Sequence, residues 1–104
     1  MNTYYALLNK MTAKPAKRDE VIAILLESGK AFNDNSSCVL YLVYKDREDP
    51  DTIWIEDVWT NQNDHSAAMN APEMRPYIMK CMPLLEGMPE QVEIDLAGGK
   101  GLDF

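Results

Sequence analysis

The sequence has few of the side chains that bind metals. It contains two cysteines and one histidine, and Cys38 and Cys81 lie in the apolar stretches "SSCVLY" and "MKCMPLL", without CxxC spacing. A zinc site of the usual kind needs several cysteine, histidine or carboxylate ligands held close together. The sequence therefore predicts no metal site, and it predicts that both cysteines are reduced, buried thiols.

Positive charge and long apolar runs are also scarce. Ten basic residues stand against 17 acidic ones, and the formal net charge is −7, which disfavours binding to phosphate backbones or anionic lipid. No apolar run approaches the roughly 20 residues of a membrane-spanning helix. The first residues, "MNTYYALLNKMTAK", lack the charged-then-apolar layout of a signal peptide. We expect a soluble cytoplasmic protein with no nucleic-acid partner and no membrane partner.

The length allows one domain. A chain of 104 residues has room for one hydrophobic core and not for two. We expect a single domain over residues 1–104, with its core over about residues 4–97 and a glycine-rich tail, "GGKGLDF", over residues 98–104.

Hydrophobic patterns predict both strands and helices. Aromatic and β-branched runs or strict alternation indicate strands over residues 4–12, 38–45, 52–59 and 90–97. Helical periodicity and cap signals indicate helices over residues 15–33, 62–69 and 76–85. Asn61 suits the N-cap of the second helix, with Asp64 three residues on. The order predicts an α+β fold, a ferredoxin-like βαββαβ subunit with a four-stranded antiparallel sheet.

The strands are apolar on both faces. An antiparallel sheet with one face in water alternates apolar and polar residues, yet "YYALL" and "CVLYLVY" are apolar throughout. Helices can cover only one face of such a sheet. For so small a chain the economical cover for the other face is a second copy of itself, so we expect a homodimer.

Five stretches, taken in order, resemble a known family: "TAKPAKRDE", "CVLYLVYKDREDPDTIWIEDVW", "TNQNDHSAAMNAPEM", "MPLLEGMPE" and "GGKGL". From about residue 4 to residue 102 the chain resembles the antibiotic biosynthesis monooxygenase (ABM) domain, in particular its small quinol-monooxygenase-like members. The resemblance implies a dimeric α+β barrel with a pocket between sheet and helices in each subunit. It also implies that molecular oxygen oxidises a small quinol or phenolic aromatic there without a bound cofactor. The alternative is a non-catalytic dimeric barrel that binds a ligand or acts in stress.

The chain departs from this family on the second and third helices. The family often carries a histidine one turn beyond the position of His65, and this chain has Ala68 there. Haem-degrading relatives use a tryptophan on the second helix and a histidine on the third, where this chain has Ala68 and Ile78. The resemblance therefore argues against haem degradation.

Asp57 and Trp59 are candidate site residues at the end of the third strand. Side chains alternate along a strand, so these two share a face with Ile53 and Ile55. If that face meets the helices, Trp59 would be a pocket wall; the alternative is that it is ordinary core packing at a strand end. A buried Asp57 has to be paired, hydrogen-bonded or functional, and burial would raise its pKa toward that of a useful base. Alternatively, Asp57 marks the point where the strand reaches solvent.

His65 is the second candidate base. Its ordinary pKa is about 6.5, so it could accept a phenolic proton or hydrogen-bond a quinol oxygen. Alternatively, it is an ordinary solvated histidine, because it lies in the first turn of a short polar helix.

Methionines and tyrosines are the candidate substrate-binding residues. Five of the seven methionines fall between residues 69 and 88, where they could line a permissive aromatic pocket or form core under the third helix. We expect Met69 and Met82 to contact substrate and the methionine-rich helix to act as a lid. Tyr41 and Tyr77 are the expected hydrogen-bond partners of a phenol; Tyr44 is a further possibility, because the sequence does not show which tyrosines face inward.

Overall fold

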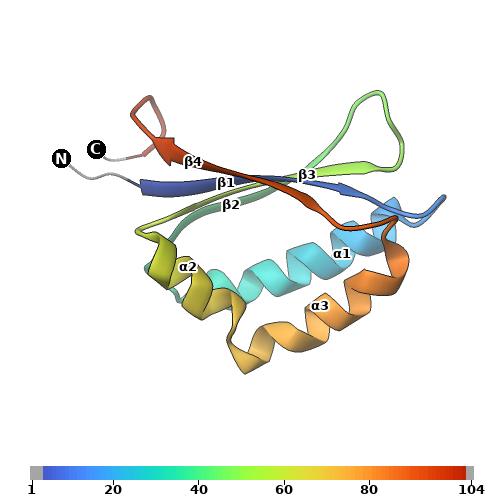
Figure 1. The fold of residues 1–104 in the computed structure, drawn as a ribbon, viewed down its shortest axis with the longest axis horizontal. Helices are drawn as coiled ribbons and strands as arrows, with labels where there is room; N and C mark the ends of the chain where they lie inside the picture. The colour runs from blue at the N-terminus through green and yellow to red at the C-terminus, as the bar shows by residue number, and fades with distance from the viewer. Residues whose placement is uncertain (1–3, 103–104) are drawn as a thin grey trace.

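The computed structural model describes residues 4–102 and contains a four-stranded antiparallel sheet with helices on one of its faces (Figure 1). The elements in chain order are β1 (Tyr4–Thr12), α1 (Arg18–Gly29), η1 (Lys30–Phe32), β2 (Cys38–Lys45), β3 (Thr52–Trp59), α2 (Gln62–Met69), η2 (Pro72–Met74), α3 (Arg75–Cys81), η3 (Met82–Leu84) and β4 (Glu90–Leu96). The predicted ferredoxin-like α+β fold is confirmed. The first three residues, and the last two of the predicted tail, lie outside the described range.

The register of the strands places the helix-facing residues. The sheet order is β2-β3-β1-β4, and Asp57 of β3 lies between Leu7 of β1 and Tyr41 of β2. A β-bulge between Cys38 and Leu40 adds one residue to β2. A bulge changes which side chains share a face, so Cys38 and Tyr41 both face the helices although simple alternation would separate them.

The first helix begins later than predicted and ends at a close contact. Ala16 has φ of 65°, a left-handed conformation that a helix cannot contain, so α1 begins at Arg18 and not at residue 15. The helix ends at Gly29, where an added Cβ would lie 2.9 Å from Cε1 of Tyr41. Gly29 is therefore needed for the close approach of the helix to the ring of Tyr41.

Buried residues gather between the helices and the sheet. One cluster includes Val21, Leu25, Ile53 and Cys81, and a second consists of Phe32, Trp59 and Met74. The second cluster lies under α2, beside the end of β3. No helix among the described residues is long and apolar enough to cross a membrane.

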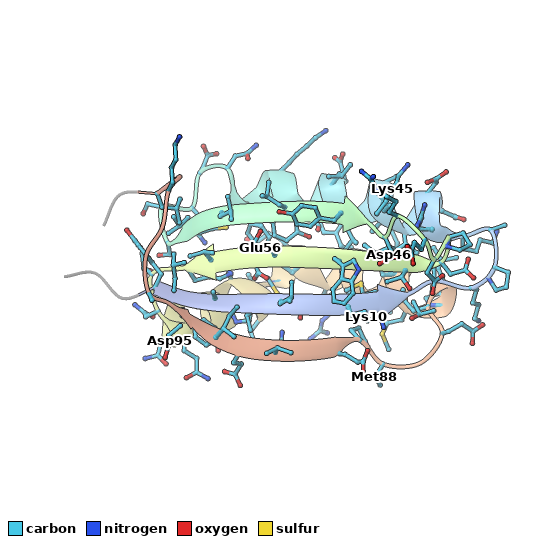
Figure 2. The ribbon with its side chains drawn as sticks, turned by 90° about the horizontal axis from the view of Figure 1, so that it is seen from above. Lys10, Lys45, Asp46, Glu56, Met88 and Asp95 are labelled. Atoms are coloured by element: carbon cyan, nitrogen blue, oxygen red, sulfur yellow. The ribbon has the colours of Figure 1, made fainter. Side chains whose placement is uncertain are left out.

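The opposite face of the sheet is uncovered (Figures 1 and 2). Alternation along the strands assigns to this face a set of exposed large apolar side chains: Leu8, Leu42, Tyr44, Val92 and Ile94. The prediction that the fourth strand is half-buried is wrong for the single chain, where residues 90–95 of β4 are all exposed. Its apolar side faces away from the helices, and its polar side faces them.

Candidate functional site

A cavity of about 270 Å³ lies between the covered face of the sheet and the helices. Most of its lining is apolar and comes from Met11, Leu25, Phe32, Ile55, Met69, Met74, Ile78, Cys81, Met82, Leu85 and Pro89. The polar groups come from Asn9, Ser28, Tyr41, Asp57, His65, Tyr77 and Gln91. Among the residues that the structure describes, the lining includes no lysine or arginine, and Asp57 is its one carboxylate. His65, when protonated, is the cationic group of this lining.

Asp57 is buried on the wall of this cavity, with only 3% of its surface exposed. Its Oδ2 accepts a hydrogen bond of 2.7 Å from Nε1 of Trp59, and its Oδ1 accepts one of 3.3 Å from Nδ2 of Asn9. Burial raises the pKa of Asp57, while the Trp59 hydrogen bond and the nearby His65 oppose that rise. The result is a carboxylate that holds a proton more readily than an exposed one, as a general base for a weak acid requires.

Trp59 lies one layer behind the cavity. Its side chain faces the helices and is fully buried, but it is not among the residues that line the cavity. Its ring packs edge-to-face on Phe32 and His65, with centroid distances of 5.2 and 5.3 Å. The expected pocket wall is thus a buried support that holds Asp57 by its N–H group.

Helix α2 carries His65 to the cavity. Asn61 caps this helix as predicted, accepting a 2.8 Å hydrogen bond from the backbone N–H of Asp64. Nε2 of His65 lies 3.9 Å from Oδ2 of Asp57, too far for a hydrogen bond in this structure. Burial lowers the pKa of His65, and the Asp57 carboxylate acts in the opposite direction. A largely neutral imidazole therefore faces the carboxylate at neutral pH.

The tyrosine and methionine candidates divide between the two faces of the sheet. Tyr41, Tyr77, Met69 and Met82 line the cavity, whereas Tyr44 is on the uncovered face. Burial raises the pKa of Tyr41 to about 12, so its hydroxyl keeps its proton, which it donates to the backbone carbonyl of Leu25 at 3.5 Å. The outer methionines of the cluster, Met79 and Met88, are exposed and contribute nothing to the lining.

Sequence reasoning missed several polar lining residues. Asn9 is the most informative, because it interrupts an apolar strand on the face that also carries Leu7 and Met11; this isolated amide was the signal that could have found it. Ser28 and Gln91 carry no comparable signal. The prediction that both cysteines are buried is half wrong: Cys81 is buried, but Cys38 is partly exposed at the edge strand.

Sequence comparison connects the chain with one family. The profile described as antibiotic biosynthesis monooxygenase matches residues 4–79. No curated protein matches the sequence.

Solved structures repeat the fold over nearly the whole chain. A candidate antibiotic biosynthesis monooxygenase from Chloroflexus aurantiacus is 36% identical, with 96% of this chain and 99% of that chain covered at a TM-score of 0.85. A variant of SnoaB, a cofactor-independent oxygenase from Streptomyces nogalater, is 15% identical, with 93% of this chain and 96% of that chain covered at a TM-score of 0.81. A candidate antibiotic biosynthesis monooxygenase from Nitrosomonas europaea is 9% identical, with 94% of each chain covered at 0.87. The last two likenesses show the fold alone.

Proposed function

Because the chain belongs to the antibiotic biosynthesis monooxygenase family, we propose that it is a cofactor-independent monooxygenase that oxidises a small quinol or phenolic aromatic with molecular oxygen. One observation carries the proposal: a buried carboxylate, Asp57, stands on the wall of an apolar cavity of about 270 Å³. Such a cavity accommodates a small aromatic and gives its hydroxyl a single strong proton acceptor.

The first step is removal of a phenolic proton. Asp57 takes the proton from the substrate hydroxyl, and the aromatic anion left in the cavity is a stronger reductant than the neutral phenol. The anion transfers one electron to dioxygen, and the two radicals combine on the ring. The intermediate then collapses, so that one oxygen atom enters the ring and the other leaves as water. For a quinol, one molecule of dioxygen gives one hydroxyquinone and one water, and the substrate supplies all four electrons.

The remaining lining residues orient the substrate and exclude water. The polar wall holds the amide of Asn9, which donates to Asp57, and the hydroxyl of Tyr41, which can turn from the Leu25 carbonyl to the substrate. Met69, Met82 and their apolar neighbours form the opposite surface. Removing water strengthens the interactions of the anion with these donors. Because Asp57 is anionic and the lining over residues 4–102 includes no lysine or arginine, the site suits a neutral aromatic better than one that carries a carboxylate.

The uncovered sheet face supports a homodimer. Its exposed apolar residues come from β1 and from the two edge strands, β2 and β4, so they extend across the full width of the sheet. A second copy packed face to face would bury this surface and complete a dimeric α+β barrel. The predicted cytoplasmic location is part of the same proposal, and it places the protein where reduced quinols and thiols persist.

Oxygen consumption tests the oxygenase directly. Purified protein is supplied with a panel of reduced hydroquinones in an oxygen electrode, and the uptake is compared with that of each hydroquinone alone. We expect uptake above autoxidation for at least one neutral hydroquinone, and weaker uptake for its carboxylated analogue. Uptake equal to autoxidation across the panel would refute the oxygenase and leave a non-catalytic binding protein.

A further inference from the structure

Glu93 of β4 links three elements at the rim of the cavity. Its side chain is on the covered face, because Glu93 pairs with Leu7 of β1. Its Oε2 accepts a 2.6 Å hydrogen bond from the hydroxyl of Tyr5 and a 3.4 Å one from Nε2 of Gln62. Gln62 begins α2, one turn before His65. Glu93 therefore joins the edge strand to β1 and to the helix that bears the histidine.

These contacts place His65 between two carboxylates. Its ring packs against Tyr5, with a centroid distance of 5.7 Å, and Tyr5 holds Glu93 on the solvent side. On the inner side, Nε2 lies 3.9 Å from Oδ2 of Asp57. Glu93 and Asp57 both raise the pKa of His65 against the larger lowering by burial.

The other titratable groups near His65 are otherwise engaged. Asp64, on the same helix, accepts hydrogen bonds from Oγ1 of Thr60 and Nδ2 of Asn61. Tyr5 donates its hydroxyl proton to Glu93, and the pKa of Tyr5 is raised to about 12. Asp57 and Glu93 are therefore the two charges that oppose the lowering of the His65 pKa by burial.

We propose that Glu93 is a positioning residue for His65, and that His65 is the group through which the substrate's proton leaves the cavity. The inference rests on the proposed function, in which Asp57 takes that proton first. The proton passes from the Asp57 carboxyl to Nε2 of His65, and from the imidazolium to bulk water at the rim. Asp57 is again a free carboxylate, and an equivalent proton returns when the second oxygen atom leaves as water.

The positions of the two side chains fit these roles, with Asp57 as the first proton acceptor and His65 as the route of the proton to water. Asp57 is almost inaccessible to water, whereas 13% of the His65 side chain is exposed. The distance from His65 to Asp57 requires a small approach, which substrate binding commonly supplies in active sites. Glu93 stabilises the imidazolium without touching the substrate, since it is not among the residues that line the cavity.

His65 is the only histidine in the chain, so its imidazole can be titrated by NMR without assignment. The variants are Glu93→Gln, Glu93→Asp and, as a matched control, Glu90→Gln on the same strand. We expect Glu93→Gln to lower the titration midpoint of His65, Glu93→Asp to restore most of the wild-type midpoint, and Glu90→Gln to leave it unchanged. If Glu93→Gln does not fold, Tyr5→Phe frees Glu93 while keeping every charge and should lower the midpoint by a smaller amount.

The pH dependence of kcat tests whether Glu93 affects catalysis through His65. Glu93→Gln should lower kcat roughly threefold at neutral pH, as expected for a partly solvated charge that acts through another residue, with KM unchanged. A midpoint and a pH profile that both match wild type would overturn the positioning role. A lowered midpoint in a protein that consumes no oxygen with any hydroquinone would support the positioning of His65 while refuting the oxygenase.

Discussion

Glu56 and Asp57 are neighbours on β3, but they lie in opposite surroundings. Asp57 faces the helices, is buried, and accepts a hydrogen bond from Trp59. Glu56 lies on the uncovered side (Figure 2), where it accepts a 2.8 Å hydrogen bond from the hydroxyl of Tyr44. The covered face has a polar cluster inside an apolar cavity, and the uncovered face has exposed apolar residues around a few charges. The two faces of one sheet thus carry the two proposals separately, the oxygenase chemistry on the covered face and the dimer contact on the uncovered face.

The largest effect expected is on the covered face. Asp57→Asn keeps an oxygen that accepts the Trp59 N–H but removes the base, so oxygen uptake should fall about 10²-fold to 10⁴-fold. Asp95→Asn, an exposed acid on the edge strand, is the control and should keep wild-type turnover. Equal loss in both variants would show that net charge, and not a base at Asp57, controls the rate.

The same variant tests how burial affects stability. The folded pKa of Asp57 is raised, so the native state binds its proton more tightly than the unfolded state does. The stability gained from that proton is present at low pH and is lost as pH rises through the folded pKa. Asp57→Asn should therefore be at least as stable as wild type at neutral pH in a urea titration, although it is inactive. A less stable variant would mean that the Asp57 charge stabilises the fold.

The next largest effect belongs to the uncovered face. Val92→Lys places a charge on an apolar residue that is 53% exposed in the single chain and buried in the proposed dimer. We expect light scattering to give a monomer of about 11.8 kDa at micromolar concentration, where wild type gives a dimer. Leu26→Lys, at a position 54% exposed on α1, is the control and should remain dimeric. A wild-type monomer would refute the dimer.

A smaller effect is expected behind the cavity. Trp59→Phe removes the N–H group that lowers the pKa of Asp57, so that pKa should rise further and the pH profile of kcat should move to higher pH. At neutral pH the rate should fall about tenfold, the usual scale for losing one hydrogen bond to a charged group. Phe32→Leu shares the loss of packing but donates nothing to Asp57, and it should leave the midpoint of the profile unchanged. A shift in both variants would indicate a general packing effect.

The smallest effect tests the contact between Gly29 and Tyr41. Gly29→Ala improves helix propensity by about 1 kcal/mol, but the new methyl group would meet the Tyr41 ring at 2.9 Å and push it toward the cavity. We expect little net change in stability and about a twofold to threefold rise in KM, because overpacking shifts neighbouring side chains. Gly98→Ala meets no atom within 4 Å and should not change KM.

Most of the fold could be predicted from local patterns in the sequence. The strands over residues 4–12, 38–45 and 52–59 and the helix over residues 62–69 have the predicted bounds, because each depends on periodicity and caps within a short window. The late start of α1 was not predictable, since an alanine at φ of 65° gives no signal in the sequence. The exposure of β4 also depends on which face the helices cover, a property of the whole sheet.

Less of the candidate site could be predicted from the sequence, because the site depends on contacts between residues that are far apart in the chain. The residues themselves suggested Asp57 and His65, but the role of Asn9 requires the β1–β3 register, and the inward position of Tyr41 requires the bulge in β2. Trp59 was expected to line the pocket, and only the packing of Phe32 and His65 around it shows that it lies behind Asp57. The connection of Glu93 to Tyr5 and Gln62 joins three elements that no local pattern relates.

Incubation of the protein with its best hydroquinone under isotopically labelled dioxygen tests the central claim most directly. Wild-type protein should give a hydroxyquinone that contains one labelled oxygen atom, at a rate well above that of the hydroquinone alone, and Asp57→Asn should give that product only at the background rate. Unlabelled product from wild type, or labelled product formed equally fast by Asp57→Asn, would contradict a monooxygenase that depends on the buried carboxylate.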